Sequence, residues 1–172
     1  MFWFAVIIVL IFGFVVFRGS PYVPSRKRYI NQAFTELYAV SKKDFLVDIG
    51  SGDGIVLREA AKLGARAIGY EINPILVVIA NLISIKNPKV KTNLADFWFA
   101  RLPDETTLVY VFSVQRDIKR LANKLQKEVN RIGEPIHLIS YAGDFDQFRM
   151  IKKKAAYRLY LISPLQPRKA QV

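Results

Sequence analysis

The chain has 172 residues, and its 26 lysines and arginines against 14 aspartates and glutamates give a formal net charge of +12. This length suits one domain with its own core, and the charge favours anionic partners such as nucleic acid, anionic lipid or acidic protein faces. The absence of cysteine and the single histidine, His137, exclude disulfides, cysteine nucleophiles and multi-histidine metal sites, and we expect no metal ion.

The first 17 residues, MFWFAVIIVLIFGFVVF, contain no charged residue. As a helix at about 1.5 Å per residue they would extend roughly 26 Å, slightly less than a ~30 Å hydrocarbon core. A cleaved signal peptide is disfavoured, because neither a basic n-region nor a small-x-small cleavage site is evident. A buried core helix is disfavoured, because every face of the helix would be apolar. We therefore predict a membrane-anchor helix over residues 1–18. Four basic residues between positions 18 and 28 then place the rest of the chain in the cytoplasm or an equivalent reducing compartment.

Residues 19–44 are predicted to form a linker and a capping helix. Pro21 and Pro24 stiffen the connection, and Ser25 is a candidate N-cap for a helix over about 26–40. The apolar face expected for this helix comprises Tyr29, Ala33, Leu37 and Val40.

From residue 45 onward, strand-like and helix-like segments alternate, so we assign residues 45–172 to one α/β domain. Asn73 is the expected cap of one helix, with Pro74 at its first position. Alternating strands and helices predict a parallel sheet with helices on both faces. The predicted strands are 45–50, 66–71, 89–94, 107–114 and 136–142, the helices are 55–64, 73–86 and 116–132, and a hairpin of two strands is expected within 148–163.

The stretch VDIGSGDG, residues 47–54, places three glycines at the end of the first of these strands. Ligands of such sheets bind outside the carboxyl ends of the strands, and glycines there let the backbone turn sharply and approach a ligand. A dinucleotide fingerprint would need glycine where Ile55 stands, and a P-loop would need a lysine, which is absent between positions 43 and 62. We therefore expect no phosphate-binding cation at this turn.

Four acidic residues are predicted to gather at the same edge of the sheet: Asp48, Asp53, Glu71 and Asp96. They would repel phosphate but attract a ligand that carries a sulfonium, an ammonium, a ribose diol and an adenine. Glu71 can accept hydrogen bonds from both ribose hydroxyls, because a carboxylate has two acceptor oxygens, and Asp96 can accept from the adenine amine. S-adenosyl-L-methionine fits this set better than NAD or ATP.

The G-x-G-x-G motif after Val47-Asp48, the acid in GYEINP and the acid after the third strand resemble the class I S-adenosylmethionine-dependent methyltransferases. The resemblance implies a Rossmann-like sheet of seven strands, mostly parallel with the last one antiparallel, and helices on both faces. With the anchor, the expected fold is this α/β domain plus one N-terminal hydrophobic helix.

A closer likeness comes from PYVPS, VDIGSGDGIVLREAAKLGARAIGYEINPILV, DFW and VFSVQRDIKRLANKLQKE. These stretches are similar to the small membrane-anchored lysine methyltransferases that modify the adenine nucleotide translocase and the c-subunit of ATP synthase. A proline-rich aromatic turn of that family is replaced here by SYAGDFDQF, residues 140–148. The likeness implies methyl transfer to a lysine of a membrane-associated protein.

The site residues expected from the sequence and from this likeness have three roles: closing the site, forming the channel and contacting the cofactor. Pro21–Ser25 would help to close the site. The channel for the methyl acceptor is assigned to Tyr22, Ser25, Phe112 and Ser113. The cofactor contacts are assigned to Asp48, Gly50, Ser51, Gly52, Asp53, Gly54, Glu71, Asn73, Asp96 and Phe97.

Two other functions compete with protein methylation. An RNA methyltransferase would use the basic surface, although the basic helix 116–132 is more typical of a solvated helix and a membrane anchor does not help such an enzyme. DNA amino-methylation is disfavoured because VFSVQ, residues 111–115, lacks an acid or asparagine followed by two prolines and an aromatic, and cytosine C5 chemistry lacks its cysteine. A non-enzymatic module is disfavoured by the intact glycine motif and Glu71.

Overall fold

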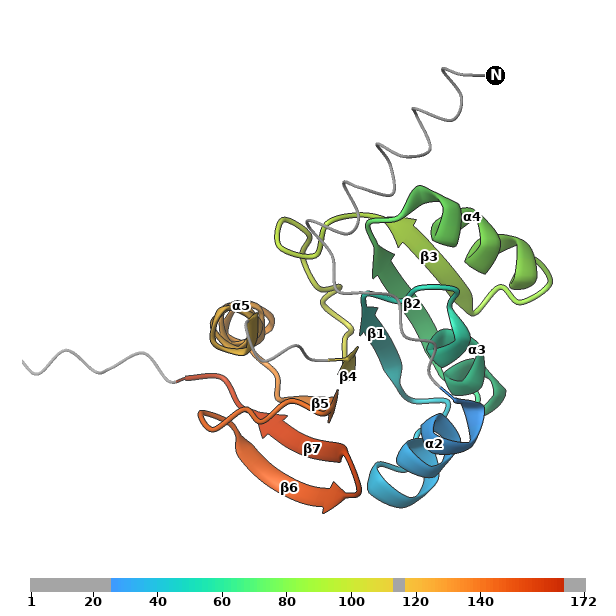
Figure 1. Ribbon diagram of the computed structural model, residues 1–172. Coiled ribbons are helices and arrows are strands. Elements are labelled where there is room, and N and C mark those ends of the chain that lie inside the picture. Colours follow the sequence, from blue (N-terminus) through green and yellow to red (C-terminus); the bar gives the residue numbers. More distant parts are fainter. Residues whose placement is uncertain (1–25, 113–116, 166–172) are drawn as a thin grey trace, which may run out of the picture.

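The computed structural model describes residues 26–112 and 117–165 (Figure 1). The predicted anchor over 1–18, the linker up to Ser25 and the candidate channel residues Tyr22, Ser25 and Ser113 lie outside these ranges. Within the described ranges, no helix combines the length and the apolar character that crossing a membrane requires.

A seven-stranded sheet with the order β3-β2-β1-β4-β5-β7-β6 forms the centre of the molecule. Neighbouring strands among the first five are parallel, and β7 is antiparallel to both β5 and β6, so the sheet is that predicted from the sequence. The predicted tail hairpin is confirmed as β6 and β7. The strands are β1 (Phe45–Ile49), β2 (Arg66–Glu71), β3 (Val90–Leu94), β4 (Leu108–Phe112), β5 (Ile136–Tyr141), β6 (Arg149–Lys154) and β7 (Tyr157–Ile162).

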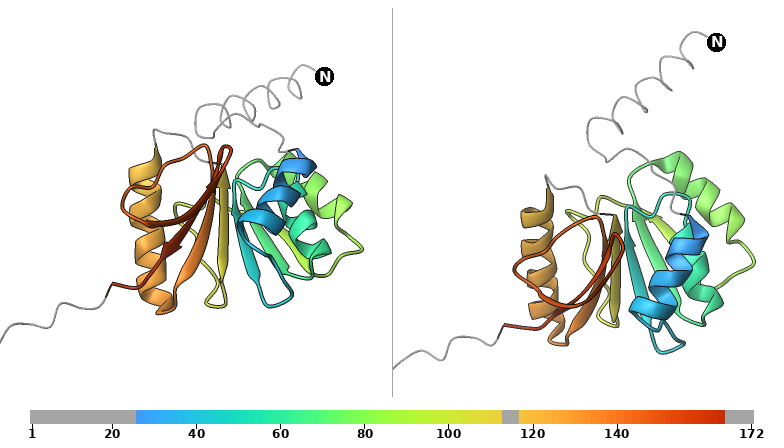
Figure 2. Two further views of the ribbon diagram at one scale, coloured as in Figure 1. Left: turned by 90° about the horizontal axis from the view of Figure 1, so that it is seen from below. Right: turned by 60° about the horizontal axis from the view of Figure 1, so that its bottom comes forward.

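Helices cover both faces of the sheet, as the alternation of segments predicts (Figure 2). One face carries α3 (Ile55–Lys62) and α4 (Pro74–Ile83), and the other carries α5 (Ile118–Ile132). Glycines with positive φ follow α3 and α5, Gly64 at +98° and Gly133 at +82°, as expected for helix ends that turn through the left-handed region. Asn73 caps α4 as predicted, because its Oδ1 accepts hydrogen bonds from the N–H groups of Ile75 and Leu76.

The helix predicted over 26–40 is shorter than expected and turns a different face to the core. It consists of α2 (Lys27–Gln32) and a π-helical turn, η1 (Ala33–Leu37), and its N-cap is Arg26. Tyr29 is 44% exposed, whereas Ile30, Ala33, Phe34 and Leu37 are buried. The predicted face is therefore wrong in part, because Ile30 and Phe34 complete a wider apolar stripe at i, i+3, i+4 and i+7 spacing.

The two faces of the sheet have separate cores, and β1, β2, β4, β5 and β7 contribute to both by alternation. Leu46 packs with the residues of α2, η1 and α3, whereas Val47 packs with α5. In β4, Tyr110 belongs to the first core and Val109 to the second. This two-sided burial fixes the register of β1 and β4, and thereby the position of the loop that follows β1.

Candidate functional site

The loop after β1 lies where the strand order of the sheet reverses. β1 pairs with β2 on one side and with β4 on the other, so the chain winds outward in opposite directions from this point. Crevices at such switch points, outside the carboxyl ends of the strands, bind ligands in open α/β sheets. The predicted glycine motif, residues 50–54, occupies this position.

All three predicted glycines of the loop have positive φ: +77° at Gly50, +54° at Gly52 and +76° at Gly54. A side chain at Gly50 would meet no atom within 4 Å, so backbone conformation rather than space requires glycine there. The N–H groups of Gly50 and Ser51 both donate to the Tyr70 carbonyl, at 2.9 and 3.2 Å. The loop is therefore attached to the end of β2.

Glu71 links this loop to the start of α4. Its Oε2 accepts the Gly52 N–H at 2.9 Å, and its Oε1 accepts the Asn73 N–H at 2.8 Å. The side chain is buried, at 8% exposure. Each carboxylate oxygen has a second lone pair, so Glu71 retains the capacity to accept hydrogen bonds from a diol.

Asp48 is a buried carboxyl group, 3% exposed, with no side-chain hydrogen bond to any described residue. Burial raises its pKa well above the usual range, and the charges of Glu71 and Asp53 raise it further. Three of the four predicted acids are thus close enough to interact electrostatically. A ligand with a positive charge or with hydroxyl donors would relieve this repulsion.

Asp48→Asn is expected to weaken the pH dependence of stability. Because the pKa is raised on folding, the folded chain binds a proton that the unfolded chain has released, so the contribution of Asp48 to the free energy of unfolding falls as pH rises above about 3.9. In urea unfolding over a pH series, the free energy of unfolding of the wild type should fall with pH relative to that of Asp48→Asn, and Asp146→Asn, at an exposed position, serves as the control. Equal slopes in the wild type and Asp48→Asn would contradict this assignment.

Asp53 has a partner that the sequence reasoning overlooked. Its carboxylate accepts the N–H of Ile55 at 3.1 Å and lies 3.3 Å from the guanidinium of Arg58, which also donates to the Asp53 carbonyl. One turn of α3 brings the cation of Arg58 back to the loop. Its charge is matched by Asp53, so the loop does not present a free cation to a phosphate.

The segment after β3 places Asp96 at the same edge of the sheet. The Ala95 N–H donates to the Glu71 carbonyl at 3.0 Å, and Asp96 Oδ1 accepts the Trp98 N–H at 2.9 Å. Phe97 is 6% exposed, and its ring packs against Tyr70 and under the ammonium of Lys124. Asp96 is thus available beside Glu71, whereas the position of Phe97 in the core gives no support to a cofactor contact.

Ser51 is turned toward β2. Its Oγ is buried without a hydrogen-bond partner among the described residues, and it lies 2.2 Å from where a Cβ on Gly69 would stand. Gly69, which the sequence reasoning did not single out, therefore makes room for the glycine loop. The predicted cofactor contact of Ser51 gains no support from this orientation.

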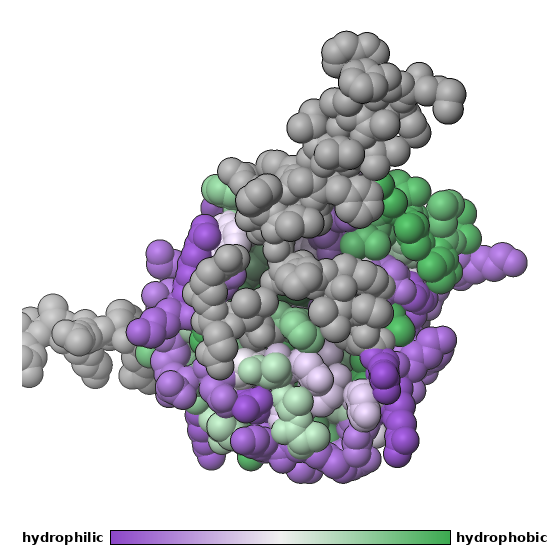
Figure 3. Space-filling model, in the orientation of Figure 1, coloured by the Kyte–Doolittle hydropathy of each residue, from purple (hydrophilic) through white to green (hydrophobic). Residues whose placement is uncertain are grey.

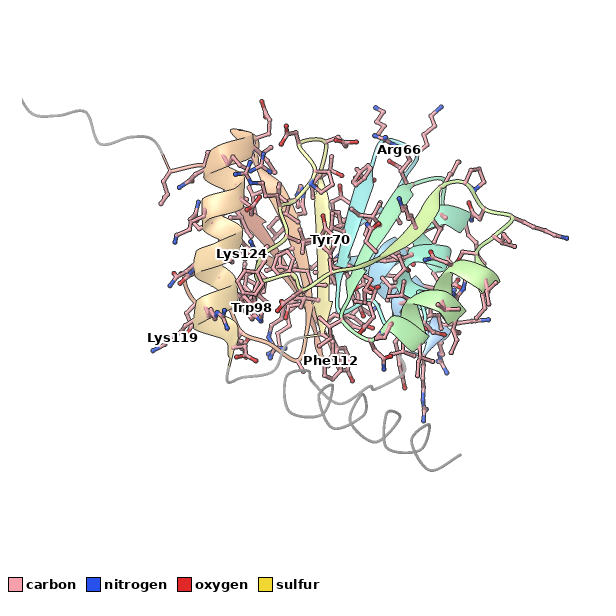
Figure 4. All side chains as sticks on the ribbon, turned by 90° about the horizontal axis from the view of Figure 1, so that it is seen from above. Arg66, Tyr70, Trp98, Phe112, Lys119 and Lys124 are labelled. Atoms are coloured by element: carbon pink, nitrogen blue, oxygen red, sulfur yellow. The ribbon has the colours of Figure 1, made fainter. Side chains whose placement is uncertain are left out.

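An aromatic pair lies at the ends of two neighbouring strands beside the loop. Phe112, a predicted channel residue, ends β4 (Figure 4). Its ring stacks on that of Tyr141 at the end of β5, with centroids 5.1 Å apart. Tyr141 also meets Tyr157 edge-on at 4.9 Å. Ala142, the next residue, has a φ of +62°, and such left-handed residues are strained and cluster at functional sites. Sequence reasoning missed Tyr141, although its position one residue from a strand end was a usable signal.

The residues present fit an adenosyl ligand with a positive charge. A buried carboxyl with a raised pKa, two further acids and the open space beside Gly50 favour a cationic molecule with hydroxyl groups over a phosphate. Among residues 26–112 and 117–165, no cluster of three or more metal-ligating side chains is present.

Comparison with known proteins gives a family match over most of this region. Residues 48–148 match the ANTKMT methyltransferase domain family. The ATP synthase c-subunit lysine N-methyltransferase of Homo sapiens is 32% identical over 112 residues, which are 63% of this chain and 47% of the relative. The adenine nucleotide translocase lysine N-methyltransferase of Mus musculus is 34% identical over 113 residues, 63% of this chain and 48% of the relative. The chain thus spans about half the length of these curated relatives.

A solved structure with the same fold is that of an RNA methyltransferase from Salinibacter ruber in complex with S-adenosyl-L-homocysteine. Its TM-score is 0.71 at 26% sequence identity, over 86% of this chain and 98% of that one.

Proposed function

The chain belongs to the ANTKMT methyltransferase domain family, and from this premise we propose that it transfers a methyl group from S-adenosyl-L-methionine to the ε-amine of a lysine in a membrane-associated protein. The proposal rests on one observation above all. At the switch point of the sheet, Glu71 holds the glycine loop and the start of α4 with one hydrogen bond each, among acids that favour a cationic adenosyl ligand.

The residues around the loop have separate roles in this proposal. Glu71 accepts the ribose hydroxyls, and Asp96 accepts the adenine amine. Gly50 and Gly52 let the backbone approach the ligand, and the positive charge of the ligand would favour the ionised form of Asp48. Asp53 stays a predicted cofactor contact. Bound S-adenosyl-L-methionine supplies a methyl group already activated on a sulfonium, so the protein needs alignment and exclusion of water more than a strong base.

We assign the lysine of the substrate to the aromatic pair Phe112 and Tyr141. Both are half-buried, and they stack at the ends of adjacent strands next to the loop. Desolvation in a dry channel lowers the pKa of a lysine, so that the amine can lose its proton before it accepts the methyl group. The aromatic rings then attract the positive charge that returns to the nitrogen as the methyl group is transferred. The predicted channel residues Tyr22, Ser25 and Ser113, and closure by Pro21–Ser25, stay predictions.

The proposal of a membrane-associated substrate is supported by two observations. The two curated relatives are named for lysine methylation of the ATP synthase c-subunit and of adenine nucleotide translocase. Residues 1–17 carry no charge, which agrees with an anchor that holds a domain over 45–172 in the cytoplasm or an equivalent reducing compartment.

Methylation of RNA is the second candidate, favoured by the net charge of +12 and by the RNA methyltransferase of Salinibacter ruber. The basic helix α5 gives it little support, because several of its cations are engaged within the protein. Arg120 lies over the Trp98 ring at 4.0 Å, Lys124 Nζ donates to the Ala100 carbonyl at 2.7 Å, and Arg131 pairs with Glu128 at 3.0 Å. Figure 4 shows Lys119 directed away from the sheet.

The two candidates are separated by labelled methyl transfer. The full chain is incubated with methyl-labelled S-adenosyl-L-methionine and either membrane protein or total RNA. The proposal expects label on lysine in the protein fraction, with Glu71→Ala as the inactive control. Label confined to RNA would overturn it.

Tyr141→Ala is expected to lower kcat/KM for the protein acceptor by about 5- to 30-fold, because a cation–π contact is worth roughly 1–2 kcal/mol when desolvated. Affinity for S-adenosyl-L-homocysteine should stay unchanged, since Tyr141 is assigned to the acceptor alone. Tyr141→Phe keeps the ring and should retain most of the activity. Steady-state kinetics with varied acceptor test this, and an equal loss in both variants would contradict the role of the ring.

A further inference from the structure

The outward face of α4 is apolar along its whole length. Val77, Ala80 and Ser84 are buried against the sheet, as expected for the inner side of a helix that covers β2 and β3. The outer side should then be polar in a helix that faces water. It is instead formed by Ile75, Val78, Ile79, Leu82, Ile83 and Ile85, which are 40–75% exposed.

We call these six residues the α4 patch. They recur at i, i+3, i+4 and i+7 spacing, so they form one continuous stripe opposite the buried side. The space-filling view shows the stripe as the strongly hydrophobic area over α4, at the upper right (Figure 3). Single exposed apolar residues are ordinary, but a continuous patch marks an interaction surface.

The charged residues at the C-terminal end of the α4 patch are lysines. Lys86, Lys89 and Lys91 are exposed just beyond its C-terminal end, and no acidic residue occurs between Glu71 and Asp96. An apolar face with lysines beside it is the pattern of a segment that lies in the interface of an anionic bilayer, with its apolar side chains among the acyl chains and its cations at the head groups.

The α4 patch lies close to the candidate cofactor site, so contact of the patch with a membrane would affect where the site is held. Asn73, which caps α4, donates its N–H to Glu71, and Ile75 is the second residue after that cap. The N-terminal end of the patch is therefore adjacent to the loop that we assign to the cofactor. A bilayer in contact with α4 would hold the site near lysines at the membrane surface.

We propose that the α4 patch docks the domain onto the surface of an anionic lipid bilayer. This inference extends the proposed function, but its test uses neither cofactor nor acceptor. Two other segments that could cover the α4 patch, residues 1–17 and a second copy of the chain, are less well matched to it by charge. Residues 1–17 carry no charge and would leave the lysines without a counterpart, and a second copy would bring together two chains of +12.

The experiment places a single reporter on the α4 patch. The full chain contains no cysteine, so Leu82→Cys provides one labelling position for an environment-sensitive fluorophore. Vesicles of phosphatidylcholine with phosphatidylglycerol are added, with and without brominated acyl chains as quenchers, and binding is followed in parallel by co-sedimentation. Ile151→Cys, at 47% exposure on β6, is the control position.

We expect the label at position 82 to shift to the blue and to be quenched by brominated lipid, and the label at 151 to do neither. Vesicles of phosphatidylcholine alone, or a high salt concentration, should reduce the blue shift and the quenching. The attraction between the lysines and the anionic head groups is absent in the first case and screened in the second. A label at 82 that stays in water while the chain is on the vesicles would overturn the proposal, as would failure to co-sediment. If the label at position 82 is shielded from water in the absence of vesicles, residues 1–17 cover the α4 patch instead. If that shielding increases with protein concentration, a second copy of the chain covers it. This measurement does not depend on methyl transfer, so it tests membrane docking even if the proposed methyltransferase function is wrong.

Discussion

Glu71→Ala is expected to weaken binding of S-adenosyl-L-homocysteine by about 100-fold or more. Hydrogen bonds to a charged group contribute about 1.5–3 kcal/mol each, and 1.4 kcal/mol corresponds to a factor of ten in affinity. The variant loses the acceptor that we assign to the ribose diol. It also releases the Gly52 and Asn73 N–H groups, so the loop and the start of α4 are no longer held together.

Calorimetric titration measures this effect directly. Glu71→Gln keeps one carbonyl oxygen and should lie between the wild type and the alanine variant. Glu105→Ala is a matched control, because Glu105 is half-exposed and pairs with Arg66 at 3.6 Å, away from the loop. Thermal unfolding checks that the variants are folded. A folded Glu71→Ala with wild-type affinity would remove Glu71 from the site.

Gly69→Ala is expected to abolish cofactor binding through the loop rather than through a lost contact. The added Cβ would stand 2.2 Å from Ser51 Oγ and 2.4 Å from Ser51 Cβ, distances that no packed structure tolerates. Since Ser51 is buried and its N–H is bonded to the Tyr70 carbonyl, the loop must shift as a unit. Overpacking of this kind costs about 1–3 kcal/mol, so we also expect a lower midpoint in urea.

A second substitution separates this steric mechanism from a general intolerance of alanine in β2. Ser51→Gly removes both of the clashing atoms, so Ser51→Gly/Gly69→Ala should recover much of the stability and affinity lost in Gly69→Ala. The coupling in this double-mutant cycle should therefore be large and favourable. Additive effects of the two substitutions would contradict a direct contact between these positions.

Local patterns were sufficient to predict the sheet and the glycine loop at its switch point. The alternation of segments predicted five parallel strands and a terminal hairpin, and the glycines after β1 predicted the loop at the switch point. Asn73 before Pro74 predicted the start of α4. These features depend on residues close together in the sequence, where capping and periodicity act.

Features that depend on distant residues were not predicted. Gly69 is needed only because Ser51 packs against it, and Tyr141 acquires its place from the register of β5 against β4. Apolar residues occur around nearly the whole of α4, so the sequence alone could not show which side faces the sheet. The structure separates the buried side from the α4 patch.

A crystal structure with bound S-adenosyl-L-homocysteine would show where the ligand lies. We expect the adenosyl group outside the carboxyl ends of β1 and β2, with both ribose hydroxyls within hydrogen-bond distance of Glu71 and the homocysteine sulfur directed toward Phe112. An adenosyl group bound elsewhere, or a ribose that does not contact Glu71, would contradict this expectation.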